Sequence, residues 1–132
     1  MGRVCAVDYG RTRTGVAFSD ASRTLAGETT VITEKNERLL AEQLAALLHE
    51  KNVTAVAVGL QGEKCRRFAA LLEARAGLPV TLIDERRTTI DAHRILTENG
   101  VFRQKRKETV DAVAAALILE IFLKRLAAEE HA

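Results

Sequence analysis

The residues best suited to chemistry in this sequence are three acids, Asp8, Glu85 and Asp111. Asp8 ends an apolar run, and Glu85 comes shortly after another run at residues 80–83. Asp111 is followed, at helical spacing, by the apolar residues Ala114, Ala115, Ile118 and Phe122. Carboxylates are rarely buried unless they are paired or bind a cation. Each acid alone could serve a turn or a helix start, but the three together favour a shared site.

Three carboxylates at one edge of a sheet would suit Mg²⁺ or Mn²⁺, because hard divalent cations prefer oxygen ligands. Two ions ~3.5–4 Å apart could then clamp the attacking and leaving oxygens of a phosphodiester. We expect Asp8 to bridge both ions, and Glu85 and Asp111 each to hold one ion or to orient the water. Asp84 should point to the opposite strand face, which indicates a structural or supporting role. No Ser-His or Cys-His arrangement suggests a protein nucleophile.

A basic segment accompanies these acids, although the formal net charge of the whole chain is only +2. Residues 86–107 contain seven Lys or Arg residues and two acids, and those at 103–107 are expected in a loop between the last two helices. Such a segment is typical of contact with a polyanion, and the alternative is a solvated loop. The expected phosphate-binding residues are Arg11, Arg13, Arg86, Arg103, Lys105, Arg106 and Lys107. With 4% aromatic residues, a single-strand stacking platform has little support.

Hydrophobic periodicity and turn residues predict the elements that would position these side chains. The expected order begins with strands at 3–8, 14–19 and about 24–33, followed by a helix capped by Asn36 and a buried strand at 53–60. It continues with a helix ended by Gly77 and Pro79, a strand at 80–83, a helix from Thr88 to near Gly100, and a last helix at about 108–127. The short turns between the first three strands favour antiparallel pairing, and the later crossovers favour parallel strands.

This order predicts one domain over residues 1–132, an α/β fold of ribonuclease H-like architecture. Its mixed five-stranded sheet would have three antiparallel strands first and helices on both faces. Such sheets hold ligands where their parallel strands end, which is where Asp8 and Glu85 would lie.

Composition excludes several other classes of protein. Apolar residues make up 47% of the chain, yet no apolar run approaches the ~20 residues of a membrane helix. The first residues lack a cationic leader and a cleavage site, so we expect neither export nor a membrane partner. Cys5 and Cys65 are expected to be reduced thiols, and neither the cysteines nor the three histidines have zinc-ligand spacing.

Four segments, in order along the chain, resemble the YqgF/RuvX family of pre-16S ribosomal RNA nucleases and Holliday-junction resolvase-like proteins. The matching segments are 8–20 (DYGRTRTGVAFSD), 58–60 (VGL), 84–89 (DERRTT) and 105–115 (KRKETVDAVAA). The resemblance covers essentially the whole chain. It implies a ribonuclease H-like fold, a cytoplasmic location, a role in ribosomal RNA maturation, and the same site residues, Asp8, Glu85 and Asp111.

Two features depart from the family pattern. Relatives usually continue the Val-Gly-Leu strand with Pro and a longer polar loop, whereas here Gln61-Gly62-Glu63 runs almost directly into a helix. That shorter loop puts substrate fit and efficiency in question. Arg87 stands where the family tends to have an apolar residue, which adds charge close to Glu85.

The sequence therefore predicts a nuclease dependent on Mg²⁺ or Mn²⁺ that cleaves phosphodiester bonds, in maturation of the 5′ end of pre-16S ribosomal RNA. Its partners would be structured RNA and pre-ribosomal particles. The alternatives are a resolvase of branched DNA, which uses the same chemistry, and a noncatalytic nucleic-acid or ribosome-binding module. Residues 8–10 also resemble the first phosphate motif of actin-like ATPases, but those proteins need two such domains. The oligomeric state stays open.

Overall fold

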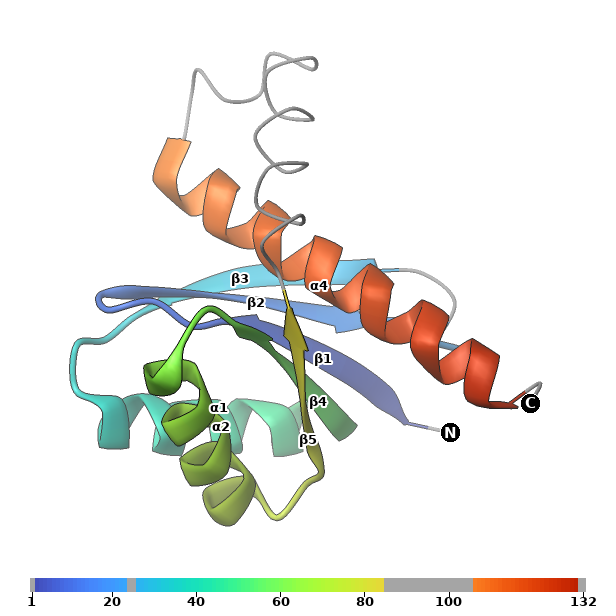
Figure 1. The fold of residues 1–132 in the computed structure, drawn as a ribbon, viewed down its shortest axis with the longest axis horizontal. Coiled ribbons are helices and arrows are strands. Elements are labelled where there is room, and N and C mark those ends of the chain that lie inside the picture. Colours follow the sequence, from blue (N-terminus) through green and yellow to red (C-terminus); the bar gives the residue numbers. More distant parts are fainter. Residues whose placement is uncertain (1, 24–25, 85–105, 131–132) are drawn as a thin grey trace.

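One five-stranded sheet organises the chain in a computed structural model that describes residues 2–23, 26–84 and 106–130 (Figure 1). The order across the sheet is β3-β2-β1-β4-β5. The strands are β1 (Arg3–Asp8), β2 (Arg13–Ser19), β3 (Ala26–Thr33), β4 (Val53–Leu60) and β5 (Val80–Asp84). The pairs β1–β2 and β2–β3 are antiparallel, whereas β4 is parallel to both β1 and β5. The predicted mixed sheet is confirmed.

Helices cover both faces of this sheet, as predicted. α1 (Glu37–Glu50) and α2 (Glu63–Ala76) lie on one face, and α4 (Arg106–Glu130) crosses the other (Figure 1). Asn36 caps α1 as expected, because its side chain accepts a hydrogen bond from the Leu39 amide. Gly77 ends α2 with a φ of 69°, a left-handed conformation that glycine adopts without steric cost.

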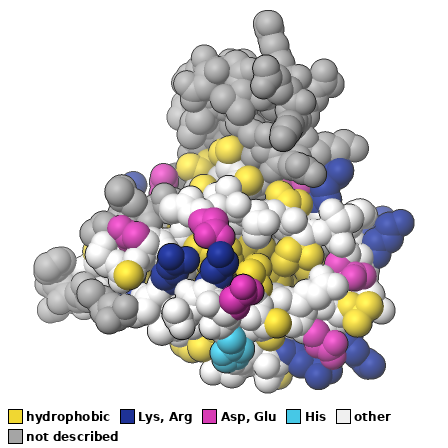
Figure 2. All heavy atoms as spheres, turned by 180° about the vertical axis from the view of Figure 1, so that it is seen from behind, with side chains coloured by type: hydrophobic (Ala, Val, Ile, Leu, Met, Phe, Trp, Pro, Cys, Tyr) yellow, Lys and Arg dark blue, Asp and Glu magenta, His cyan; other side chains and the backbone are white. Residues whose placement is uncertain are grey.

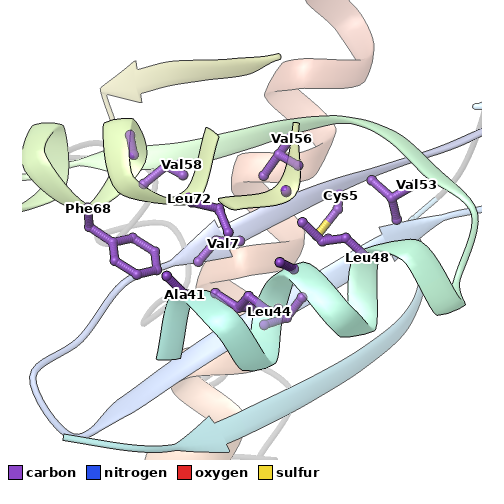
Figure 3. Packing of buried hydrophobic residues seen from close by; sticks show 14 of the residues in the cluster. Cys5, Val7, Ala41, Leu44, Leu48, Val53, Val56, Val58, Phe68 and Leu72 are labelled. Atoms are coloured by element: carbon purple, nitrogen blue, oxygen red, sulfur yellow. The ribbon is translucent and has the colours of Figure 1, made fainter. Parts of the chain in front are cut away.

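The core between the sheet and the α1–α2 layer is aliphatic, apart from buried aromatic rings such as Phe68. Leu40, Leu44 and Leu48 form the buried stripe of α1, and each is at most 1% exposed. Full burial of such a leucine contributes about 1.5–3 kcal/mol relative to exposure. Figure 3 shows these side chains packed on the strands, with Phe68 at one end of the cluster and Val53 at the other.

A second core lies between the sheet and α4. Successive β1 side chains alternate between the two cores, so Val4 and Ala6 pack toward α4 while Cys5 and Val7 pack toward α1 and α2. The sheet contributes the small residues Ala6, Ala17 and Ala57 to this core, and α4 contributes Ala115, Ile118, Leu119, Phe122 and Leu123. Small strand residues let α4 approach the sheet closely.

Some element boundaries differ from the sequence prediction. α4 begins at Arg106 rather than near residue 108, so Arg106 and Lys107 belong to the helix and not to a loop. Arg and Lys are good helix formers, which favours this earlier start. β5 extends to Asp84 because that residue pairs with Leu60 of β4. The helix predicted at 88–100 lies outside the described residues.

Cys5 and Cys65 form no disulfide and are buried, in agreement with the prediction of reduced thiols in the core. Burial raises the pKa of the Cys5 thiol, since the thiolate would lose its hydration. In the described part of the chain, no helix has the length and apolar character needed to cross a membrane.

Candidate active site

Asp8 is the last residue of β1 and lies at the carboxyl end of the strand, on the rim where the β1–β2 turn begins. Val4 and Ala6 face α4, so the strand alternation assigns Asp8 to that same face. Its side chain is half-buried. Across the antiparallel pair, its direct partner is Gly15 of β2.

Gly15 brings α4 close to Asp8. A Cβ atom at this position would collide with the backbone carbonyl oxygen of Asp111, so any side chain larger than hydrogen would push the helix away. Residues directly opposite in an antiparallel pair have their side chains on the same face. Asp8 and Asp111 therefore flank one glycine on one face of the sheet.

Asp111 stands at the rim end of the buried stripe of α4. Ala114, Ala115, Ile118 and Phe122, the apolar residues in line with it, are each at most 5% exposed. The Asp111 side chain itself is 26% exposed. The stripe therefore orients Asp111 toward the sheet while its position near the helix start keeps it in reach of solvent.

Arg13 of β2 forms an ion pair with Asp111, with 3.8 Å between Nε and Oδ2. Its side chain is 35% exposed, so solvent screens the pair and the stabilisation is small, about 0–1 kcal/mol. The contact places a positive charge beside the two acids. Arg13, which the sequence assigned to phosphate binding, thus lies at the acidic site.

The turn between β1 and β2 is held by Thr14, whose role the sequence analysis missed. Thr14 is fully buried, and its hydroxyl accepts a hydrogen bond from the Gly10 amide at 3.3 Å. Gly10 is needed there because a Cβ atom would collide with the Arg13 carbonyl oxygen. The pattern in the sequence that could have indicated this turn contact is a threonine four residues after a glycine. The turn carries Tyr9 and Arg11, next to Asp8.

The other predicted site residues fall outside the described part of the chain. These are Glu85, Arg86, Arg103 and Lys105, together with the side chains of Arg106 and Lys107. The described part of β5 ends at Asp84, which is exposed, after Ile83, which is buried in the α4 core. Ile83 and Asp84 therefore lie on opposite faces of β5.

The donor chemistry at this rim suits a hard divalent cation, since both Asp8 and Asp111 offer carboxylate oxygens. The described residues alone contain no group of three or more His, Cys, Asp or Glu side chains able to hold a metal ion. Asp8 and Asp111 are thus two members of the predicted trio, and a third ligand is needed to complete a site.

A cavity of about 420 Å³ opens beside Tyr9, the residue after Asp8, on the α1–α2 side of the sheet. It is lined by the β1–β2 turn, the start of α1 and the short segment that leads into α2: Tyr9, Gly10, Arg11, Lys35, Glu37, Gln61, Gly62, Glu63, Lys64 and Cys65. The shortened loop after Leu60 therefore borders this cavity. The sequence analysis did not foresee it, because its walls come from three separate segments.

Charges of both signs are mixed on the surface of the described residues. Figure 2 shows Lys and Arg side chains among Asp and Glu side chains on the face opposite to that of Figure 1. The coloured side chains of this face therefore form no patch of a single sign.

Comparison with known proteins places these features in a family. The family model described as "RuvX: Holliday junction resolvase" matches residues 2–125. A protein of Koribacter versatilis with the provisional name pre-16S rRNA nuclease is 37% identical, covering 94% of this chain and 88% of its own. A Listeria monocytogenes protein of the same name is 40% identical, covering 92% of this chain and 96% of its own.

Solved structures share the fold at low sequence identity. The Fowlpox virus resolvase, solved in complex with substrate Holliday junction DNA, superposes with a TM-score of 0.62 at 14% identity. The match covers 94% of this chain and 98% of that protein. The ribonuclease H-like fold predicted from the order of elements is thereby confirmed.

Proposed function

Because the chain belongs to the RuvX family, we propose that it is a metal-dependent nuclease that hydrolyses phosphodiester bonds of pre-16S ribosomal RNA at the 5′ end. The names of the curated relatives support this substrate. This hydrolysis would take place in the cytoplasm, on structured RNA within pre-ribosomal particles.

One observation carries the proposal: Asp8 and Asp111, far apart in the sequence, flank Gly15 on one face of the sheet. A purely structural fold has little reason to hold two carboxylates at one rim, because their mutual repulsion costs stability. Arg13 offsets part of that repulsion through its contact with Asp111. A bound cation would offset more.

We assign Asp8, Glu85 and Asp111 as the ligands of Mg²⁺ or Mn²⁺, with two ions in the complete site. When bound, such ions lower the pKa of a water and offset the charge that develops at phosphorus. Glu85 directly follows Asp84 in the sequence, next to the end of β5. Asp8 ends β1, the central strand of the sheet, and would be the ligand shared by both ions.

The remaining cations would bind the substrate strand. Arg13 is close enough to the acids to contact the scissile phosphate, and Arg11 lies on the same turn. Arg86, Arg103, Lys105, Arg106 and Lys107 complete the proposed phosphate-binding set. These residues would orient the backbone without reading its sequence.

A second candidate is a resolvase of branched DNA. The Fowlpox virus resolvase supports it, since that protein shares the fold and was solved with a Holliday junction. Both activities use the same phosphodiester chemistry, so the choice between them depends on the substrate alone. A noncatalytic ribosome-binding module is the third candidate, and the short loop after Leu60 is what favours it.

The experiment is a cleavage assay of wild type, Asp8→Asn and Asp111→Asn in Mg²⁺ or Mn²⁺, with a pre-16S RNA fragment and a four-way DNA junction in parallel. Loss of one outer-shell partner already costs about 10–100-fold, so loss of a metal ligand should cost at least about 100-fold. Asp84→Asn is the matched control and should cleave normally. Equal rates for all four proteins, on both substrates, would exclude the assignment. Inactivity of wild type itself would favour the binding module.

A further inference from the structure

We propose that the cavity beside Tyr9, here called the Tyr9 pocket, receives one unpaired nucleotide of the substrate strand next to the scissile phosphate. This inference rests on the proposed nuclease function and adds to it a requirement for unpaired substrate. The pocket is defined by Tyr9, Arg11, Lys35, Glu37, Gln61 and Lys64.

The size and place of the pocket suit a single nucleotide. Its volume of about 420 Å³ lies in the range of about 300–1,000 Å³ that is usual for small-molecule sites. Asp8 immediately precedes Tyr9, and adjacent Cα atoms are about 3.8 Å apart. Side-chain alternation sends Asp8 toward α4 and Tyr9 toward α2, so the sheet rim separates the two. A strand crossing this rim at Asp8 could therefore place its next nucleotide in the pocket.

Tyr9 offers a rigid aromatic surface there. Its ring stacks on Phe68, with 4.3 Å between the ring centroids and 4° between the planes. Phe68 is fully buried in the core cluster, where Figure 3 shows it at the end, near Val7 and Ala41. Since Phe68 covers one face of the Tyr9 ring, only the other face and the ring edge can border the pocket. A base could stack on that face.

The hydroxyl end of Tyr9 lies near Glu37, which also lines the pocket. Burial of the Tyr9 side chain, together with the Glu37 carboxylate, raises the pKa of Tyr9, so the hydroxyl remains protonated at neutral pH. The stack on Phe68 holds the ring before any ligand arrives, so binding costs little conformational entropy.

The charge of the pocket favours a phosphate-bearing ligand. Arg11, Lys35 and Lys64 line it, and within the described residues none of the three takes part in an ion pair. Of the two lining acids, Glu37 lies near the Tyr9 hydroxyl, and Glu63 pairs with Arg66 at 3.6 Å. An aromatic face next to several cations is typical of sites that bind unpaired nucleotides.

A base-paired nucleotide would not fit this arrangement, because its base is already stacked and hydrogen-bonded in a helix. Proteins read RNA chiefly where bases are unpaired and can stack on aromatic side chains. The pocket therefore predicts that the strand at the cut has an unpaired nucleotide, as in a single-stranded end, a bulge or a junction.

The test uses the full chain and RNA carrying one 2-aminopurine, whose fluorescence falls when it stacks on an aromatic ring. The label is moved along a single-stranded overhang in one series, and stands inside a full duplex in the other. Binding is measured in EDTA, so that no cleavage occurs. The variants are Tyr9→Leu, which removes the stacking face, and Tyr9→Phe, which keeps it.

We expect quenching at one overhang position for wild type and for Tyr9→Phe, and no quenching for Tyr9→Leu. Base stacking on an aromatic ring corresponds to about 5- to 150-fold in affinity, so Tyr9→Leu should bind the overhang RNA more weakly by a factor in that range. Its affinity for the full duplex should be unchanged, which also checks that the variant is folded.

Three outcomes would overturn the inference. The first is wild-type fluorescence that does not change at any overhang position. The second is an equal loss of affinity for overhang and duplex in Tyr9→Leu, since that indicates a structural role. The third is adenosine monophosphate binding as tightly as the strand, since that indicates a free nucleotide as the ligand. Quenching without any cleavage in Mg²⁺ or Mn²⁺ would disprove the nuclease proposal but not nucleotide binding in the Tyr9 pocket. Cleavage without quenching would disprove nucleotide binding in the Tyr9 pocket but not the nuclease proposal.

Discussion

Gly15 of β2 lies against the backbone carbonyl of Asp111 in α4, with no room between them for a side chain. Because Gly15 is also the direct partner of Asp8, this single contact sets how close the helix comes to the end of β1. The candidate site thus depends on a residue that carries no functional group. Close backbone packing at this glycine thus helps to position both acids.

The first prediction concerns this contact. Gly15→Ala should displace the start of α4, lower the free energy of unfolding by about 1–3 kcal/mol, as overpacking does, and reduce cleavage. Urea denaturation and the nuclease assay measure the two effects. Gly27→Ala is the control, since its Cβ would lie 3.4 Å from the Phe18 carbonyl oxygen, an ordinary contact. A Gly15→Ala protein as stable and active as wild type would contradict this prediction. It would show that the start of α4 can shift away from β2 without loss of stability or activity.

The second prediction concerns metal binding. Mg²⁺ or Mn²⁺ should stabilise wild type against unfolding by about 2.7 kcal/mol at 100 times the dissociation constant, because only the folded chain assembles the site. Asp8→Asn and Asp111→Asn should lose most of this stabilisation, and Asp84→Asn should keep it. Thermal unfolding in EDTA and in a metal titration gives the measurement. Equal stabilisation of all four proteins would place the metal elsewhere.

The third prediction concerns Arg13. Arg13→Gln should destabilise the metal-free protein by up to about 1 kcal/mol, because the Asp111 charge loses its nearby cation. Added Mg²⁺ should reduce the difference in the free energy of unfolding between wild type and Arg13→Gln, since the metal then offsets the negative charge of Asp111. The matched control is Arg75→Gln, which breaks another 3.8 Å pair, with Glu42, far from the acids. If metal leaves the effect of Arg13→Gln unchanged, Arg13 does not act through the acidic site.

The fourth prediction concerns the basic segment. Replacement of Arg103, Lys105, Arg106 and Lys107 by Ala should weaken nucleic-acid binding on all sequences alike. The slope of log K against log salt should flatten by about 0.7 per lost contact on single strands and about 0.9 on duplex. Metal affinity should stay nearly constant.

The control for this variant is replacement of Lys124 and Arg125, two exposed cations near the opposite end of α4. A wild-type slope in the quadruple variant would indicate a merely solvated segment. In that case we would assign phosphate binding to Arg11, Arg13, Arg86 and Arg87.

The sequence by itself determined the order and type of the described elements, because these depend on local chemistry. The alternation at 3–8, the Asn36 cap and the Gly77 end each involve neighbours only a few residues away. The buried stripe of α4 likewise follows from helical spacing, and it correctly oriented Asp111 toward the sheet. The boundary error at Asp84 arose because pairing with Leu60 of β4, a distant residue, extends the strand, whereas at Arg106 the local helix preference of Arg and Lys was overlooked.

Only the tertiary structure decided which of these residues meet. The Arg13–Asp111 pair, the Tyr9–Phe68 stack and the Gly15 contact each join segments that are far apart in the chain. Periodicity assigns a face to each residue within its own element, but not the distance between elements. That distance comes from close packing, in which a missing Cβ at Gly15 fixes the position of α4 and a buried ring at Phe68 fixes that of Tyr9.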